Sequence, residues 1–164
     1  MVVLKKILVA TDFGEASDAA LNYGRELART FGATLHVLHV VENVMSQYAT
    51  EFAFAAYPEV QKQVEDAAGK QLNTLLGEED REKLGARPVL RTSTAPAVAI
   101  VDYAKEERVD LIVVGTHGRG AVAHFLMGSV AERVVRSAPC PVLTVRSPEH
   151  EFVLPYALVA VARA

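Results

Sequence analysis

The sequence predicts a doubly wound, Rossmann-like α/β domain, in which helices cover both faces of a five-stranded parallel sheet. Short apolar runs rich in Val, Ile and Leu alternate along the chain with segments whose apolar residues recur at helical spacing. Strands buried on both faces are typical of parallel sheets, and the alternation requires crossover helices on those faces. A length of 164 residues suits one domain with one core.

The first half of the chain is expected to form two strand–helix pairs. In chain order these are a strand over Lys6–Thr11, a helix whose inward residues run from Ala16 to Ala28 and which Gly32 ends, a strand over Thr34–Val41, and a helix over Val60–Leu75. Both strands are apolar runs of the kind that parallel sheets bury. Glycine is common after a helix C-terminus, and Pro58 suits the first turn of the second helix.

The second half is expected to add three strands and two helices. In chain order these are a strand over Arg87–Thr92, a helix with Ser93 or Thr94 as its cap and Pro96 in its first turn, a strand over Leu111–Val114, a helix from Ser129 to about Ser137, and a strand over Pro141–Val145. Hydroxyl side chains favour the N-cap because they accept hydrogen bonds from the first free amides of a helix. The total is five strands and four helices.

Two stretches lie outside this alternation. Met45–Tyr57 is a long connection with several aromatic residues, which we interpret as a loop, with a partner-binding segment as the alternative. Ser147–Ala164 is too apolar for a solvated tail, so we expect it to pack on its own sheet or on a second subunit. The sequence therefore predicts one domain over residues 1–146 and a C-terminal extension over residues 147–164.

The composition excludes several classes of partner. The chain is 51% hydrophobic and 23% charged, with a net charge of −3, so no basic face for nucleic acid or for an anionic membrane is expected. No apolar stretch reaches the ~18 residues that a membrane span needs, and lysines interrupt the apolar run where a signal peptide would need one. The single cysteine, Cys140, cannot form an internal disulfide, which suits a reducing compartment. We therefore expect a cytoplasmic protein.

Two strand ends carry residues suited to a ligand site. In open α/β sheets, ligands bind outside the carboxyl ends of the strands. The first predicted strand ends in Thr11-Asp12, and the fourth is followed by Gly115-Thr116-His117-Gly118. Glycines at 115 and 118 let backbone amides approach an anion closely.

The helix that follows supplies the other half of this site. Gly128-Ser129 opens it, and a helix N-terminus offers free N–H groups and a partial positive charge to a phosphate. The spacing Gly115-x2-Gly118-x9-Gly128-Ser129 therefore predicts a phosphate-binding loop. The structural alternative is that Ser129-Val130-Ala131-Glu132 is a capping box that closes the helix. The two interpretations are compatible, since a capping serine leaves the first amides free.

Other nucleotide-binding motifs do not fit this sequence. Gly-x4-Gly-Lys-[Ser/Thr] does not occur, which excludes a P-loop NTPase. Gly118-Arg119-Gly120-Ala121-Val122-Ala123 matches a loose dinucleotide fingerprint, but it follows the fourth strand rather than the first. No acidic residue for a ribose lies ~20 residues further on, so we reject this match.

Five colinear segments resemble the universal stress protein family, from about Lys5 to Arg146. They are Lys5–Phe13, Leu38–Val41, Asp110–Gly118, Gly128–Glu132 and Ala138–Val145. The glycine spacing is the pattern of the family's nucleotide-binding (ATP-binding) branch. The resemblance implies the sheet order 3-2-1-4-5, which puts the carboxyl ends of the first and fourth strands side by side. It also implies homodimers that form through the fifth strand, here Pro141–Val145.

The resemblance implies an adenine-nucleotide site, with ATP and Mg²⁺ (or Mn²⁺) as its ligands. Ala10 would line the adenine pocket and Val40 would bind the base through its main chain, while Asp12 would lie near the ribose, the phosphates or a bound metal. Gly115 would approach the ribose. The residues that would hold the phosphates are Gly118, Gly128, Ser129 and Val130. Thr11 belongs to the same strand end, and Arg119 could neutralise phosphate charge.

The sequence departs from the family pattern at two places near this site. Gly14 stands where many relatives have a serine, which removes a cap and a polar contact. The third strand is followed by Thr94-Ala95-Pro96 in place of Gly-x-Pro, so the Thr94 side chain would narrow the base pocket. The tail after Arg146 has no counterpart in the family pattern.

Individual residues have structural alternatives. Asp12 is a carboxylate after a buried strand, which is costly without a purpose, although it could cap the first helix. His117 and Arg119 could touch a phosphate or could lie at the surface. His36 and His39 point to opposite faces of a strand, so they cannot share a metal ion, and His39 is expected to pack at the end of the sheet. Cys140 is expected to be an inert core thiol.

The predicted loop lacks an evident catalytic apparatus, since phosphoryl transfer needs a positioned base and cationic clamps. We therefore expect a universal stress protein that binds ATP or a related adenine nucleotide and acts as a binding and signalling module in the stress response. One alternative is a slow Mg-dependent ATP hydrolase, with Asp12 holding the metal and His117 or Arg119 polarising the phosphates. The other is a nucleotide-free dimeric scaffold.

Overall fold

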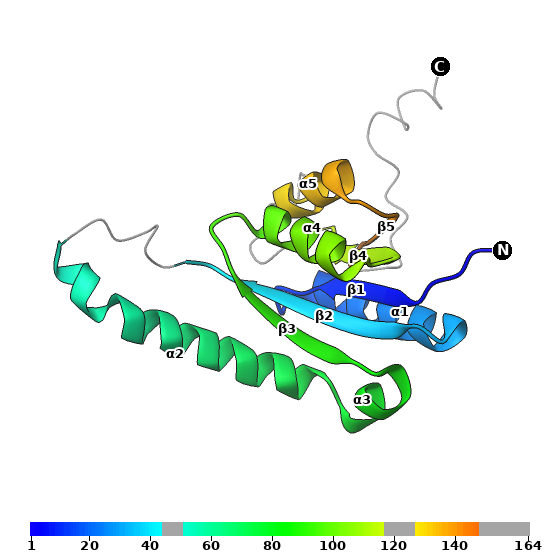
Figure 1. The fold of residues 1–164 in the computed structure, drawn as a ribbon, viewed down its shortest axis with the longest axis horizontal. Helices are drawn as coiled ribbons and strands as arrows, with labels where there is room; N and C mark the ends of the chain where they lie inside the picture. Colours follow the sequence, from blue (N-terminus) through cyan, green and yellow to red (C-terminus); the bar gives the residue numbers. More distant parts are fainter. Residues whose placement is uncertain (44–50, 117–126, 148–164) are drawn as a thin grey trace, which may run out of the picture.

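The computed structural model describes residues 1–43, 51–116 and 127–147 of the chain. The elements within them are, in chain order, β1 (Lys6–Ala10), α1 (Glu15–Phe31), β2 (Thr34–Val41), α2 (Glu51–Leu75), α3 (Glu78–Leu84), β3 (Arg87–Thr92), α4 (Pro96–Glu107), β4 (Leu111–Gly115), α5 (Ser129–Ser137) and β5 (Val142–Val145). The strands form one twisted sheet with helices packed across it (Figure 1). The predicted strands are confirmed, each within one residue at either end.

The sheet has the order β3-β2-β1-β4-β5, and all four neighbouring pairs are parallel. This confirms the doubly wound fold and the order 3-2-1-4-5. The chain winds from β1 toward β3 on one side and from β4 to β5 on the other. Ala10 therefore lies opposite both Leu38 of β2 and Val114 of β4. The point where the winding reverses is the place where open α/β sheets bind ligands.

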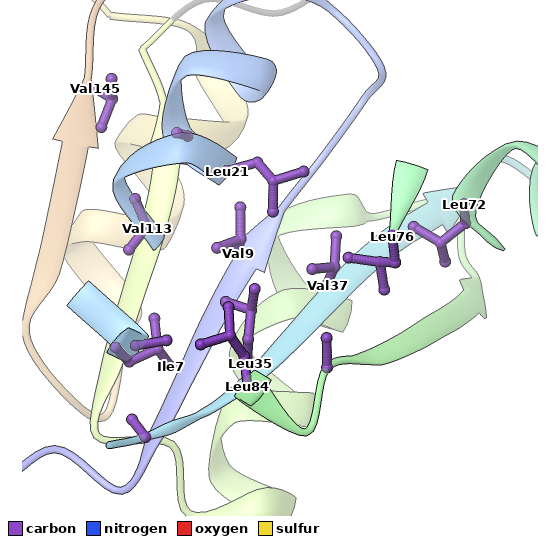
Figure 2. Packing of buried hydrophobic residues seen from close by; sticks show 14 residues of the cluster. Ile7, Val9, Leu21, Leu35, Val37, Leu72, Leu76, Leu84, Val113 and Val145 are labelled. Carbon is purple, nitrogen blue, oxygen red and sulfur yellow. The ribbon is translucent and has the colours of Figure 1, made fainter. Parts of the chain in front are cut away.

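Two hydrophobic clusters, one on each face of the sheet, form the core. In β1, Ile7 and Val9 belong to one cluster and Leu8 to the other, and all three are fully buried. The first cluster packs the sheet against α1, α2 and α3, and Figure 2 shows its side chains gathered between these helices and the strands. The second packs it against α4 and α5. Burial on both faces explains why the central strands β1 and β4 are continuous apolar runs rather than alternating ones.

The second helix is longer than the sequence predicts. α2 begins at Glu51, so residues 51–57 of the predicted loop are helical and Pro58 lies inside the helix. The loop interpretation was wrong for these residues because it relied on proline as a first-turn residue, whereas the preceding segment is rich in alanine, the strongest helix former. The rest of the predicted loop lies outside the described residues. Although α2 has 25 residues, no helix of the described chain is long and apolar enough to cross a membrane.

α3 was not predicted from the sequence, so the described residues contain five helices rather than four. This helix is short and mostly charged, and only Asp80 and Leu84 are buried. Nε of Arg25 in α1 donates to both carboxylate oxygens of Asp80, at 3.0 and 3.1 Å. A tertiary ion pair and one apolar anchor therefore hold α3, and neither leaves a periodic pattern in the sequence.

Candidate functional site

The connection from β1 to α1 is held by hydrogen bonds within its own residues. Asp12 Oδ1 accepts the N–H of Gly14 at 3.0 Å, and Thr11 Oγ1 accepts the N–H of Phe13 at 3.0 Å. Ser17 Oγ lies 3.1 Å from Thr11 Oγ1 and donates to the Gly14 carbonyl at 2.8 Å. Gly14 is the N-cap residue of α1, so Asp12 also supports the start of this helix. Its partly exposed carboxylate lies at the carboxyl edge of the sheet, where a ligand would bind.

Phe13 has a left-handed backbone conformation with φ 62°, which non-glycine residues rarely adopt. Its ring packs against the imidazole of His39, with the centroids 4.2 Å apart and the planes at 35°. Nδ1 of His39 lies 2.8 Å from the Thr11 carbonyl oxygen. The prediction that His39 packs at the end of the sheet is therefore confirmed. The role of Phe13 was missed, because its contact with β2 is not visible in the local sequence.

His36 and His39 lie on opposite faces of β2, as predicted. His36 is almost fully buried against α4, and its Nδ1 is 2.8 Å from the hydroxyl of Tyr103. His36 Nε2 is a buried atom without a hydrogen-bond partner among the described residues. Burial, followed by the positive charge of Arg87, lowers the pKa of His36 below its usual 6.5. His36 is thus a core histidine, held neutral, and does not belong to the candidate site.

The end of β4 lies directly against the first turn of α1. A Cβ on Gly115 would lie 2.7 Å from the carbonyl carbon of Ala16 and 2.8 Å from its oxygen. Helix packing therefore requires this glycine, a reason that is separate from the predicted approach of a ligand. Thr116 follows, with its N–H donating to the Val145 carbonyl at 2.8 Å.

The N-terminus of α5 is joined to this strand end, because the N–H of Gly128 donates to the carbonyl of Thr116. Gly128 is the N-cap residue, and in the part of the chain that the structure describes no side-chain hydrogen bond caps the helix, so the predicted capping box at Ser129 was wrong. The helix begins at Ser129 itself, one position too late for its hydroxyl to cap, and Glu132 accepts Nε of Arg136 at 3.1 Å instead. Ser129 and Val130 are exposed in the first turn.

The predicted base-pocket residues lie at the ends of β1, β2 and β3. Ala10 and Val40 are partly buried, and Val40 lies opposite Arg91 of β3. The expected cap of α4 was wrong, because Ala95 is its N-cap residue and no side chain caps it. Ser93 Oγ instead accepts the N–H of Ala95 at 3.0 Å, while Thr94 is exposed.

The structure brings together several of the predicted site residues at one edge of the sheet. They are Ala10, Thr11, Asp12, Val40, Gly115, Gly128, Ser129 and Val130. Gly118, Arg119 and His117 lie outside the described residues, so this part of the predicted loop stays a prediction. A surface groove of about 570 Å³ between α1 and α3, where Arg25 pairs with Asp80, contains none of the predicted site residues.

The donor set at this edge fits a magnesium ion that arrives with a nucleotide. Mg²⁺ is commonly bound by one or two carboxylates together with substrate phosphates and waters, and Asp12 offers one carboxylate. In the part of the chain that the structure describes, no three His, Cys, Asp or Glu side chains cluster as a metal site.

Cys140 lies just before β5, away from the β1–α1 connection. Burial raises the pKa of its thiol above 9.0, so little thiolate forms at neutral pH. This agrees with the expected unreactive thiol, because the thiolate is the nucleophilic form.

Comparison with known proteins assigns the family. The model of the universal stress protein family matches residues 4–146. A universal stress protein of Methanocaldococcus jannaschii is 32% identical over 148 residues, which cover 90% of this chain and 85% of that protein. One of Thermus aquaticus is 34% identical over 145 residues, which cover 88% of this chain and all of that protein.

The same likeness extends to three dimensions. The structure of universal stress protein UspA from Lactobacillus plantarum superimposes with a TM-score of 0.73 and 26% identity, covering 89% of this chain and all of that one. Residues 4–146, which the family model matches, contain all five strands of the sheet and both halves of the candidate site. This chain therefore belongs to the universal stress protein family.

Proposed function

We propose that this protein binds an adenine nucleotide, ATP with Mg²⁺, at the carboxyl edge of the sheet and acts as a binding and signalling module of the stress response. The observation that carries the proposal is the joint between β4 and α5. The hydrogen bond from Gly128 to Thr116 sets the first turn of α5 at this edge, and among the described residues no side-chain hydrogen bond caps that turn. Free amides and the helix dipole make such a turn a phosphate site.

Asp12 supplies a carboxylate at the neighbouring strand end, where it would bind the Mg²⁺ ion that accompanies the phosphates. Its hydrogen bond to Gly14 fixes the side chain near the start of α1. A bound Mg²⁺ would neutralise phosphate charge there, with Asp12 as its protein ligand. Ala10, Thr11 and Val40 then lie on the base and ribose side, and Gly128, Ser129 and Val130 on the phosphate side. Gly115, Gly118 and Arg119 complete the proposed set.

Structures of the same fold support an adenine nucleotide as the ligand. A universal stress protein in complex with cAMP superimposes with a TM-score of 0.56 and 23% identity. Another, from Archaeoglobus fulgidus in complex with dAMP, superimposes with a TM-score of 0.52 and 22% identity. Both proteins share the fold of this chain and bind a nucleotide that contains adenine, which supports adenine as the base. The experiment below identifies the number of phosphates.

Slow Mg-dependent hydrolysis of ATP is the second candidate function. The position of the Asp12 carboxylate at the end of β1 favours it, since a metal held there would polarise a phosphate. Any polar phosphate site can show weak turnover, and we expect binding rather than efficient catalysis to be the main role.

We also propose that the protein is a cytoplasmic homodimer formed through Pro141–Val145. In the described chain β5 pairs with β4 alone, so its other side is an edge that can accept a second copy. Residues 147–164 would pack on the domain or on that second subunit. Sedimentation velocity over a range of concentrations tests this proposal, and the measured mass should be twice that of one chain.

The nucleotide proposal is tested by what purified protein releases on denaturation. Chromatography of the supernatant should show an adenine nucleotide, and ATP with Mg²⁺ added to nucleotide-free protein should raise its melting temperature. Absence of both effects would contradict binding and favour a nucleotide-free dimeric scaffold. A released nucleotide without adenine would correct the ligand and keep the phosphate site.

A further inference from the structure

The main chains of β1 and β2 stop pairing just beyond Ala10. The N–H of Thr11 donates to the Leu38 carbonyl at 2.9 Å, in register with the ladder before it. In a parallel ladder, the next two bonds would join the Val40 N–H to the Thr11 carbonyl and the Phe13 N–H to the Val40 carbonyl. Instead, side chains form hydrogen bonds with the Thr11 carbonyl and with the Phe13 N–H.

The side chain of His39 binds the Thr11 carbonyl. Its Nδ1 lies 2.8 Å from the Thr11 carbonyl oxygen. A carbonyl oxygen only accepts hydrogen bonds, so Nδ1 of His39 carries the proton and donates. The ring that makes this bond packs against Phe13 at a centroid distance of 4.2 Å.

The side chain of Thr11 binds the Phe13 amide, because its Oγ1 accepts the N–H of Phe13 at 3.0 Å. This bond accompanies the left-handed turn at Phe13, with φ 62°. Arg108 is the other non-glycine residue with positive φ among those described, and it ends α4 as a C-cap. Phe13 ends no helix, so its conformation serves the strand–helix connection, where strain in a fold tends to mark function.

On the β1 side, the main chain of Val40 therefore has no backbone hydrogen-bond partner among the described residues. The Leu38 carbonyl accepts from Thr11 on the β1 side, whereas the Val41 carbonyl accepts from Ser93 on the β3 side. Main-chain groups of successive strand residues point alternately to the two sides, so Val40 points toward β1. Its N–H and carbonyl form an adjacent donor and acceptor at the candidate site.

We propose that His39 is a positioning residue for the base: by capping the Thr11 carbonyl it ends the β1–β2 ladder early and leaves the main chain of Val40 open to an adenine edge. The inference rests on the proposed function. Adenine presents an amino donor beside a ring-nitrogen acceptor, which matches a carbonyl beside an N–H. Guanine in the same pose presents an acceptor and a donor in the opposite order, so the site discriminates against it.

The first test needs no nucleotide and follows amide hydrogen exchange by NMR. In nucleotide-free protein, the Val40 amide should exchange at least ~10-fold faster than the Leu38 amide, which lies inside the ladder. His39→Leu frees the Thr11 carbonyl, so the Val40 amide should become protected. His39→Asn retains a donor near the position of Nδ1 and should keep exchange fast. Equal protection of Val40 and Leu38 in the wild-type protein would overturn the proposal.

The second test measures dissociation constants for ATP, GTP and inorganic tripolyphosphate, each with Mg²⁺. His39→Leu and His39→Phe should reduce the preference for ATP over GTP by ~10-fold or more, the value of a paired base contact. His39→Phe keeps an aromatic ring against Phe13, so it separates stacking from capping. The affinity for tripolyphosphate should not change, whereas a general loss of structure would lower it.

His36→Leu is the matched control, because it alters a histidine of the same strand on the opposite face. It should retain the wild-type preference for ATP, as should His39→Asn. An unchanged ATP preference in folded His39→Leu would overturn this inference alone. Failure of the wild-type protein to bind ATP, GTP and tripolyphosphate would contradict the proposed function as well.

Discussion

The backbone N–H of Gly128 donates to the carbonyl of Thr116, so the first turn of α5 and the end of β4 are fixed to each other. The N–H of Thr116 is bonded in turn to the Val145 carbonyl at 2.8 Å, which ties the joint to β5. Three elements thus meet at the edge where Asp12 follows β1. This joint gives the proposed phosphate site its rigidity, since its position depends on paired strands rather than on a loop alone.

Gly115→Ala should destabilise the protein by about 1–3 kcal/mol, a usual range for overpacking. The new methyl group would meet backbone atoms of Ala16, which cannot move without shifting α1. Gly69→Ala in α2 is the matched control, because nothing lies within 4 Å of its Cβ position. That variant should be stabilised by about 0.5–1 kcal/mol, as for glycine replaced within a helix. Urea unfolding measures both, and equal stability of the two variants would contradict the packing argument.

His36 should make the stability depend on pH below neutrality. Burial, and next the positive charge of Arg87, lowers its pKa in the folded protein below the usual 6.5. The unfolded chain therefore binds a proton first, and the free energy of unfolding falls as the pH decreases through 6.5 toward the folded pKa. The charges around the ring are Arg87 and Lys6, which lower the pKa, and Glu107, which raises it.

Urea unfolding at several pH values tests this dependence. One proton gives a slope of at most about 1.4 kcal/mol per pH unit. His36→Leu should remove that part of the slope, because leucine does not titrate. If the wild-type protein and the variant lose stability in parallel between pH 7.5 and 5.5, His36 is not the responsible group.

Asp12→Asn should reduce the contribution of Mg²⁺ to ATP binding. Asparagine keeps an oxygen that can accept the Gly14 N–H, so the start of α1 is preserved while the charge is removed. Calorimetric titration with ATP should show tighter binding with Mg²⁺ than with EDTA in the wild-type protein, and a much smaller difference in the variant.

The same variant decides whether Asp12 supports hydrolysis. Phosphate release from Mg-ATP that persists unchanged in Asp12→Asn would assign that activity to another site or to a contaminant. Loss of the activity together with retained ATP binding would support the second candidate function.

The inner strands could be predicted from the sequence because each one places apolar residues on both faces. Lys6–Ala10 and Thr34–Val41 supply residues to both hydrophobic clusters, so their runs stand out without any knowledge of neighbours. The order of the strands came from the family resemblance, because local patterns carry no information on which strands pair. α3 depends on Arg25 and Asp80, which are 55 positions apart, and its own residues are too polar to indicate a packed helix.

The candidate site was predictable in its residue types but not in its contacts. The glycine spacing indicated Gly115 and Gly128, yet the packing of Gly115 on Ala16 arises only when α1 folds back on the sheet. The capping box failed by a single position, because Ser129 starts α5 instead of preceding it. The contact between Phe13 and His39 joins the β1–α1 connection to β2 and has no local signature.

The most direct test of the nucleotide site is a calorimetric titration of Mg-ATP into the wild-type protein, Gly128→Glu and Gly77→Glu. Both glycines are helix N-cap residues with ordinary backbone angles, φ −69° for Gly128 and −71° for Gly77, so neither backbone conformation requires glycine. The carboxylate at α5 would occupy and repel the phosphate position, whereas the one at α3 lies elsewhere. We predict that Gly77→Glu binds Mg-ATP with the wild-type dissociation constant and that Gly128→Glu, although folded, does not bind it. Wild-type affinity in folded Gly128→Glu would contradict the proposed site.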